Sequence, residues 1–483
     1  MKQKDFIFNI AILLFLNILI KPFWILGVDV AVQNQVGAAA YGLYFAILNF
    51  TFLFNVVLDM GITNFNNRNI ARHNILVKKH LSGIITLKLL LGIIYLLITF
   101  IIAVCIGYDT AHLKLLFWIA INQFLNAFIL YLRSNISALF MFKTDSILSI
   151  LDRLLMIIIC SILLWTNCIH STFKIEYFVY AQTASYTLSA ITAWIVVASK
   201  THFQHLHFNR AFCLMILKKS FPFALIYLLM AFYSRIDSVM IERILPAEIA
   251  TTEAGIYASA FRLLDALVTI AYLFSVILLP LFSKMLKEKE NLISILRTAM
   301  ALLFFFSVTS VTILLWYKIP ILQLLYNEHI TESAAVFTFI IPCLIPVAGT
   351  YIWGTLLTAN GNMRFLNLSA IVGIIINLCI NFLLIPILHA RGAAIASLTT
   401  QTVMLCIQSI IAFRILHLPL KAFPWWRYII FTITFISIVG MSTHYLHCHV
   451  LICLIINGVF AFCIALATRL FPLQFWKDLR TNP

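Results

Sequence analysis

Four ionisable side chains lie close together in two neighbouring apolar stretches of the sequence. Arg235 and Asp237 precede the end of one stretch, and Arg262 and Asp265 follow the start of the next. A charge inside hydrocarbon is costly, so an ionisable residue there marks a functional site by default. Arginine presents a planar fork of hydrogen-bond donors that matches a phosphate group. The pattern therefore favours a binding site for an anionic group.

Composition indicates which elements must position these charges. The chain has 483 residues, of which 63% are hydrophobic and 10% charged, whereas a soluble domain carries about 25% charged residues. This excludes a soluble enzyme and a nucleic-acid-binding module, and it predicts an all-α polytopic membrane protein. A β-barrel would instead show strands of about 10 residues with alternating polarity. A membrane-spanning helix needs roughly 20 mostly apolar residues. Fourteen stretches meet this requirement: 6–28, 41–61, 81–106, 114–139, 149–168, 177–199, 221–241, 257–282, 297–317, 334–359, 366–388, 391–413, 428–446 and 449–468.

The distribution of Lys and Arg predicts how these helices are oriented. When the connecting loops alternate between the two sides, 23 of the 33 cations, Arg153 among them, fall on the side of both termini and 5 on the other. Cytoplasmic loops carry the excess of Lys and Arg, so both termini are predicted to be cytoplasmic. One missed or extra span would move every later loop to the opposite side, so the unequal split supports the number of spans.

Depth in the membrane divides the charges within the spans into two groups. The outer group lies roughly 8–10 Å from the outer ends of its helices. Its members are Lys21, Arg235, Asp237, Arg262 and Asp265. The inner group lies near the cytoplasmic ends, and its members are Asp59, Lys88 and Arg133. Each group has a surplus of one cation, which would attract an anionic ligand.

These charges also have a purely structural interpretation. They could form salt bridges between helices, and a lysine such as Lys21 could extend its ammonium group to the membrane surface. Arg262 and Asp265, at i,i+3 on one helix, can pair with each other. Arg235 and Asp237, at i,i+2, do not face each other, so Arg235 must contact another helix or a ligand.

An internal repeat organises the spans. Adding 213 to the limits of the first six spans reproduces those of the next six to within about ten residues, and Gly42 then corresponds to Gly255. Two pseudo-symmetric six-helix lobes are therefore expected, 1–213 and 214–420, with two additional helices and a cytoplasmic tail in 421–483. Transporters with parallel repeats bind substrate at the repeat interface, so we expect the site in a cleft between the lobes.

No catalytic, metal or cofactor site is predicted. Ser, His and Asp do not combine into a nucleophile, a base and an orienting group. The histidines within 202–207 and 444–449 lack the spacing of a recognised metal site. The ten Cys are scattered singly, which predicts buried small side chains and no disulfide framework. The protein is therefore not expected to be an enzyme.

Several segments of the sequence resemble one known family. They are IKPFWILGVDVAVQNQVGAAAYGLYFAILNF (20–50), LDMGITNFNNRNIA (58–71), FYSRIDSVMIERI (232–244), TEAGIYASAFRLLDA (252–266) and GNMRFLNLSAIVGIIINLCINFLLIPILHARGAAIAS (361–397). As a set they are similar to the Wzx-type oligosaccharide-lipid flippases of the multidrug/oligosaccharidyl-lipid/polysaccharide (MOP) superfamily. The resemblance covers essentially the whole chain.

The resemblance implies a transporter of the bacterial inner membrane that works by alternating access. Its substrate would be one oligosaccharide repeat unit on undecaprenyl diphosphate, moved to the periplasmic leaflet for capsule or O-antigen synthesis. Expected partners are this lipid, the bilayer, a polysaccharide polymerase and chain-length machinery, but no nucleic acid. By motif position, diphosphate binding is carried over to Arg235 and Arg262, with Asp237 and Asp265 orienting them. Depth and charge alone add Arg133, Lys88 and Lys21.

Three other functions stay open. A cation-coupled multidrug exporter would favour unpaired carboxylates, whereas cations outnumber carboxylates in both groups. A flippase for the peptidoglycan lipid precursor would share the fold and the same charges. A membrane glycosyltransferase or polymerase would need an acidic catalytic motif and usually a large outer loop, and the longest outer loop here has about 20 residues.

Overall fold

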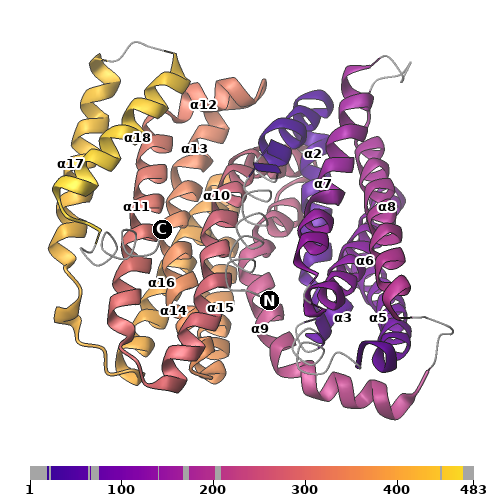
Figure 1. The fold of residues 1–483 in the computed structure, drawn as a ribbon. Helices are drawn as coiled ribbons and strands as arrows, with labels where there is room; N and C mark the ends of the chain where they lie inside the picture. Colours follow the sequence, from indigo (N-terminus) through magenta and orange to yellow (C-terminus); the bar gives the residue numbers. More distant parts are fainter. Residues whose placement is uncertain are drawn as a thin grey trace. The chain divides into compact units, whose positions relative to one another are not determined.

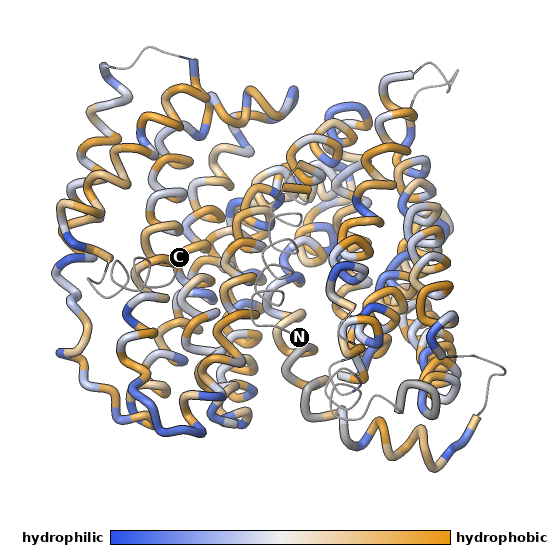
Figure 2. The backbone as a smooth tube through the Cα atoms, viewed as in Figure 1, coloured by the Kyte–Doolittle hydropathy of each residue, from blue (hydrophilic) through white to orange (hydrophobic). Residues whose placement is uncertain are grey.

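The structure, a computed structural model, is helical throughout the part of the chain that it describes. It describes residues 19–20, 23–63, 66, 76–139, 141–166, 173–201, 208–445 and 449–471, and these contain no strands. Eleven helical segments within these ranges are long and apolar enough to cross a membrane. Figure 2 shows that apolar residues predominate along the helices and that hydrophilic residues gather near many of their ends. The predicted all-α polytopic fold is confirmed.

The eleven segments match eleven of the fourteen predicted spans. Of the other three, the span 6–28 lies largely outside the described residues. The spans 177–199 and 221–241 fall within two long helices, α8 (Ile175–Thr201) and α9 (Arg210–Ile244). The expected number of about fourteen is therefore compatible with the observed helices.

The chain forms two compact units, Met1–Gly255 and Ile256–Pro483. The first unit contains the segments that Figure 1 colours from indigo to magenta. Besides α8 and α9 they are η1 (Trp24–Asp29), α2 (Val30–Leu53), α3 (Val56–Asp59), α5 (Leu76–Ile106), α6 (Thr110–Ala138), α7 (Phe142–Trp165) and the start of α10 (Ala247–Glu288). The domain limits predicted at 213/214 and 420/421 stay predictions.

Within the first unit, α6 packs against α8 and α2 packs against α9. One buried core joins Ile84 and Leu87 of α5 to Leu132 of α6 and Ile216 of α9. Other large apolar side chains of α5, such as Ile93 and its neighbours one turn apart, are exposed. A helix with apolar residues on both its buried and its exposed sides suits a hydrocarbon environment.

The first two predicted spans are not separated by the expected loop. Residues 24–53 instead form one helical segment, which begins as the π-helix η1 and is broken only at Gly37, where φ is 81°. Asp29 therefore lies inside a helix and is 2% exposed. A prediction from hydropathy alone ends a span at such a charge, because hydropathy takes no account of a hydrogen-bond partner such as Tyr41.

The second unit contains the remaining helices. After α10 they are α11 (Leu292–Trp316), α12 (Lys318–Leu325), α13 (Ile330–Ile340), η2 (Ile341–Cys343), α14 (Leu344–Ala359), α15 (Met363–Leu388), α16 (Ala390–Ile415), η3 (Leu420–Ala422), α17 (Trp425–Tyr445) and α18 (Val450–Ala467). Helices α15 and α16 form a tightly packed hairpin, while α14 packs against both α11 and α16.

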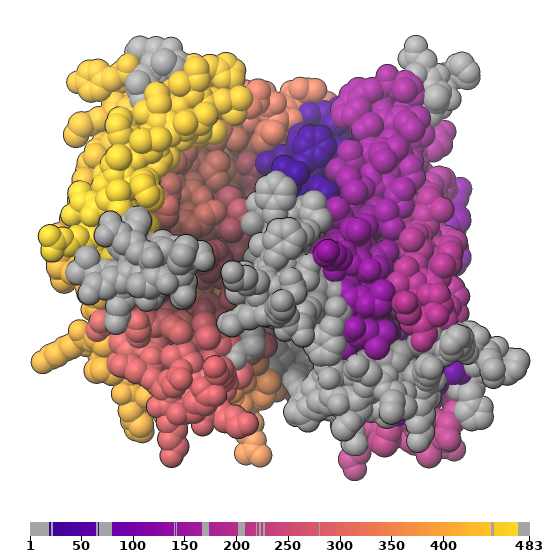
Figure 3. Space-filling model, viewed as in Figure 1, coloured from indigo at the N-terminus to yellow at the C-terminus, as the bar shows by residue number. Residues whose placement is uncertain are grey.

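The last two helices are attached to the second unit through α11. Figure 3 shows them in yellow along one side of that unit. Asn457 of α18, which is fully buried, accepts a hydrogen bond from Ser442 of α17 (2.9 Å) and donates one to the hydroxyl of Tyr317 (3.3 Å), the residue after α11. A buried polar network of this kind holds helices together within a membrane.

The two glycines related by the repeat lie at one close crossing of α2 and α10. A Cβ atom added to Gly42 would lie 1.9 Å from the carbonyl oxygen of Thr251, and one added to Gly255 would lie 2.0 Å from that of Ala38. Gln33 also donates to the Gly255 carbonyl (3.2 Å). The sequence correspondence between Gly42 and Gly255 therefore has a structural cause, since both positions permit the backbones to touch.

Candidate functional site

Lys88, predicted in the inner group, is held by its own unit. Its side chain is 1% exposed, and its ammonium group donates to the carbonyl of Leu58 (3.0 Å) and pairs with the carboxylate of Asp59. The Asp59 carboxylate also accepts hydrogen bonds from Thr63.

This ion pair stabilises the point at which helix α3 ends, within the second predicted span. Helix α3 ends at Met60, whose φ is 48°, followed by Gly61 with φ 76°. Carbonyls at such an end lack an intrahelical partner, and Lys88 supplies one to Leu58. The geometry favours the structural interpretation for Lys88, and its contact with substrate stays a prediction.

Arg133, also of the inner group, pairs with a residue that the sequence analysis did not consider. Its Nε lies 2.8 Å from Oδ1 of Asp145. The pair joins α6 to the first turns of α7, and the side chains are 20% and 10% exposed. An ion pair that is partly accessible could still exchange one partner for a ligand.

Arg235 and Asp237 lie on α9 in different surroundings, as their i,i+2 spacing predicts. The Cζ atom of Arg235, which is half-buried, lies 5.4 Å from the centre of the Phe52 ring of α2. Asp237 is 1% exposed. A guanidinium group over an aromatic face is positioned by a cation–π contact.

Arg262 and Asp265 lie on α10 in the second unit. Their side chains approach to 4.0 Å, the i,i+3 pairing that the sequence predicts, and are 14% and 20% exposed. The predicted outer group therefore draws its members from both units, and a common site for them stays a prediction. Lys21 lies outside the described residues.

The sequence analysis missed an arginine in the middle of a span. Arg153 was counted among the cytoplasmic loop charges, but α7 begins at Phe142, so Arg153 lies roughly 15 Å along the helix. Its Cζ atom lies 5.8 Å from the ring centres of both Trp24 and Tyr186. It also forms a hydrogen bond with Tyr186 and contacts Asp152 (3.5 Å).

Arg153 belongs to a polar network in the first unit that joins four helical segments. The hydroxyl of Tyr41 donates to Oδ2 of Asp29 (2.8 Å), and Gln182 donates to the hydroxyl of Tyr44 (2.8 Å). Asn122 donates to Gln182 in turn (3.4 Å). We refer to the set Asp29, Tyr41, Tyr44, Asn122, Arg153, Gln182 and Tyr186 as the first-unit network.

Two signals in the sequence could have indicated this network. Asp29 interrupts an otherwise apolar stretch, and the pair Asp152-Arg153 lies four residues inside the predicted span 149–168. Their aromatic and amide partners come from distant segments, so only the fold could join them.

A second polar cluster ties the end of α9 to the connection between α5 and α6. Glu242 pairs with Arg243 (2.7 Å), accepts a hydrogen bond from Tyr108 (3.4 Å) and lies 3.9 Å from His112. The guanidinium of Arg243 lies 3.8 Å from the centre of the Tyr108 ring. Burial raises the pKa of the Tyr108 hydroxyl. This cluster fastens helix ends and offers no open ligand position.

The carboxylate of Asp109 caps α6 in the same connection. It accepts hydrogen bonds from the backbone N–H of His112 (2.8 Å) and from its ring. These bonds hold the pKa of Asp109 below its ordinary value of 3.8. Among the described residues, no group of three His, Cys, Asp or Glu side chains is arranged to hold a metal ion.

Together, the long apolar helices and the charges held inside their bundles indicate a multi-pass membrane protein. In fold, the chain is similar to the lipid II flippase MurJ in an inward closed conformation. The TM-score is 0.71 at 13% identity, and the match covers 98% of this chain and 99% of that chain.

Other transporters share the fold over a smaller part of the chain. An inward-facing multidrug resistance MATE family transporter of the MOP superfamily has a TM-score of 0.62 at 13% identity, over 82% of this chain and 94% of that one. A MOP superfamily transporter from Pyrococcus furiosus, described as having a binding pocket of reverse polarity, has a TM-score of 0.55 at 13% identity, over 85% and 93%.

The family follows from the sequence itself. The profile of the polysaccharide biosynthesis protein family matches residues 7–286, so the chain belongs to that family. No curated protein matches the sequence. The predicted relationship to polysaccharide flippases of the MOP superfamily is confirmed at the level of family and fold.

Proposed function

We propose that this protein moves an oligosaccharide linked to undecaprenyl diphosphate from the cytoplasmic to the periplasmic leaflet of a bacterial inner membrane. The observation that carries the proposal is its membership of the polysaccharide biosynthesis family, combined with arginines held inside membrane-spanning helices. Transport would proceed by alternating access and without catalysis. Both termini would lie in the cytoplasm.

Arg235 and Arg262 would bind the diphosphate. The ring of Phe52 positions Arg235, and Arg262 lies 4.0 Å from Asp265. Both guanidinium groups are partly exposed, so an incoming phosphate can reach them. Asp237 and Asp265 would orient them. A polar head that crosses hydrocarbon without partners loses about 2–7 kcal/mol for each unpaired group, which a hydrated cationic path would avoid while the lipid tail stays in the bilayer.

A flippase for the peptidoglycan lipid precursor is the second candidate. The similarity to MurJ extends over 98% of this chain, whereas the similarity to the MATE transporter extends over 82%. Both candidates place a diphosphate-linked sugar lipid on the same arginines. These arginines would not help a cation exporter, because they carry the same charge as its substrate.

Charge reversal tests the role of the arginines. Arg235→Glu and Arg262→Glu, made in a strain whose own repeat-unit flippase is deleted, should each abolish surface glycan while membrane levels of the protein stay normal. Lys287→Glu is the matched control, because Lys287 lies on the same helix as Arg262 and is exposed. Full glycan display by both arginine variants would remove them from the site.

Reconstitution separates the two substrates. Vesicles that contain the purified protein should flip undecaprenyl-diphosphate oligosaccharide faster than the peptidoglycan precursor. A preference for the precursor would assign the second function.

A further inference from the structure

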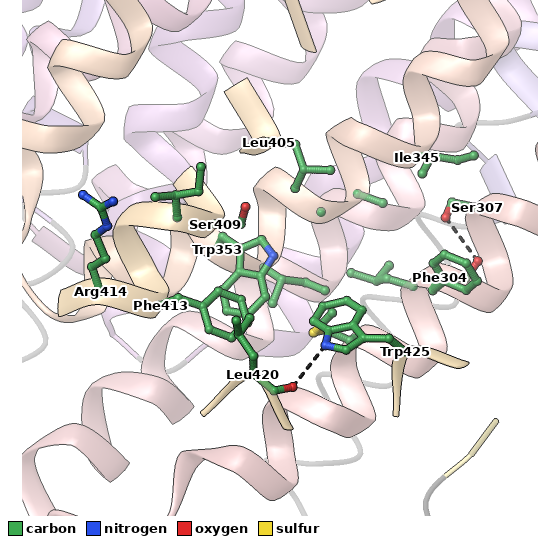
Figure 4. Close-up of a pocket in the computed structure, with 16 residues that line it drawn as sticks. Phe304, Ser307, Ile345, Trp353, Leu405, Ser409, Phe413, Arg414, Leu420 and Trp425 are labelled. Carbon is green, nitrogen blue, oxygen red and sulfur yellow. Dashed lines mark hydrogen bonds between the residues drawn. The ribbon is translucent and has the colours of Figure 1, made fainter. Parts of the chain in front are cut away.

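The second unit contains an apolar cavity of about 570 Å3 between α11, α14, α16 and α17. Figure 4 shows the cavity and its lining. Its walls include Leu303 and Phe304 of α11, Trp353 of α14, Leu405 of α16 and Trp425 of α17. Protein interiors are close-packed, so a space of this size beside a bilayer is expected to be filled.

The uncharged polar side chains of the walls already have backbone hydrogen-bond partners. The hydroxyl of Ser307 donates to the carbonyl of Phe304 (3.2 Å), and that of Ser409 donates to the carbonyl of Cys406 (3.0 Å). The indole N–H of Trp425 donates to a backbone carbonyl at 3.1 Å. A buried water needs two to four polar partners, which these walls do not offer, so hydrocarbon suits the cavity better than water.

One charged residue lines the cavity. Arg414 lies near the end of α16, is exposed, and has no hydrogen-bond or ion-pair partner among the residues that the structure describes. Figure 4 shows it at one side of the cavity, with Phe304 and Ser307 at the opposite side. Arginine and tryptophan together are typical of a membrane surface. The ligand that fits has an apolar chain and an anionic head.

The position of the cavity suggests what such a ligand does. In the described part of the chain, α17 and α18 pack against each other, and α11 is the main helix that both of them contact besides. The first turn of α17 contributes Trp425 to the cavity wall, and Trp353 of α14 and Phe413 of α16 also line it. A chain that fills the cavity would therefore join α17 to α14 and α16.

We propose that this cavity binds an acyl chain of an anionic phospholipid, with the phosphate of its head group on Arg414. Arg414 lies on the side predicted to be cytoplasmic, where anionic lipids attract basic residues. The inference does not depend on the transported substrate, because any protein of this fold surrounded by bilayer would meet such lipids.

The test compares phospholipids on delipidated protein. Protein stripped in detergent is mixed with phosphatidylglycerol or phosphatidylcholine, and bound lipid is counted by native mass spectrometry. Phosphatidylglycerol should bind and raise the thermal unfolding midpoint, and phosphatidylcholine should do so much less. Arg414→Gln should weaken phosphatidylglycerol binding about tenfold, the loss of one charge-assisted hydrogen bond.

A second variant tests the chain site independently of the head group. Ser409→Phe places a ring in the cavity and should abolish binding, whereas Ser409→Ala removes only a satisfied hydroxyl and should not. Arg364→Gln is the control for charge, since Arg364 is exposed, lies on the same predicted side and does not line the cavity.

Four results would overturn the inference. They are equal binding of both phospholipids, unchanged binding by Ser409→Phe, the same stabilisation by inorganic phosphate alone, and preferential binding of undecaprenyl phosphate. The last result would assign the cavity to a carrier lipid. Loss of glycan export with phosphatidylglycerol binding intact would count against the transport proposal only.

Discussion

Replacing Asp59 with alanine would leave the ammonium group of Lys88 buried. Among the described residues, its remaining partners would be the Leu58 carbonyl and the Tyr131 ring, 5.8 Å away. Breaking a buried ion pair by removing one member costs about 3–5 kcal/mol. Asp59 is 31% exposed and Lys88 1%, so solvent compensates part of the loss and we expect a cost of about 3 kcal/mol. The thermal unfolding midpoint should fall by roughly 6 °C.

Removing the lysine as well should restore stability. Lys88→Met takes away the buried charge and keeps the volume of the side chain, while the Asp59 carboxylate retains its hydrogen bonds from Thr63 and its contact with solvent. Lys88→Met alone should therefore cost only about 1–2 kcal/mol. In the double variant Asp59→Ala/Lys88→Met, about 2 kcal/mol of the loss caused by Asp59→Ala should be recovered.

The assay is a double-mutant cycle of thermal unfolding midpoints in one detergent, with glycan display measured in parallel. Additive losses in the cycle would refute the ion pair as the stabilising interaction. Normal stability of Lys88→Met combined with lost export would refute the structural role and return Lys88 to the substrate site.

Three further perturbations follow from the structure. Asn457→Leu should cost about 1–3 kcal/mol by removing the buried hydrogen bonds of Asn457 with Ser442 and Tyr317, seen as a lower unfolding midpoint and faster proteolysis between α17 and α18. Gly255→Ala should prevent accumulation of folded protein, because its Cβ would lie 2.0 Å from a backbone carbonyl oxygen, whereas Gly458→Ala meets nothing within 4 Å and should accumulate normally. Because the folded-state pKa of Asp109 lies below 3.8, its charge stabilises the fold above that pH, and this contribution is lost as pH falls through the lowered pKa. Asp109→Asn, which can still cap α6, should therefore make the unfolding midpoint less sensitive to acid, and an unchanged acid dependence would contradict this.

The sequence predicted those features that depend on residues close together in the chain. The apolar runs matched eleven observed helices, and the i,i+3 spacing of Arg262 and Asp265 predicted their contact. Each of these signals is local or periodic.

Long-range partners could not be predicted. The ion pairs Lys88–Asp59 and Arg133–Asp145 join different helical segments, and composition does not specify which helices meet. Arg153 was counted with the loop charges because it lies close to the start of the predicted span 149–168, whereas the helix begins seven residues earlier, at Phe142. Without it the split of cations is 22 to 5, so the predicted orientation is unaffected.

The exposed fraction of each interior cation indicates whether its side chain can bind and release a phosphate. A cation that binds and releases a phosphate must be accessible, because a group fully committed to a buried partner would need several kcal/mol to exchange it. Lys88, at 1% exposure with two fixed acceptors, fails this condition. Arg133, Arg153 and Arg262, at 20%, 26% and 14%, meet it. Arg153 is further held between two aromatic rings, which reduces the freedom lost when a ligand binds. Contact with substrate stays a prediction for each of these cations, and for Lys88 it would require the buried ion pair with Asp59 to open.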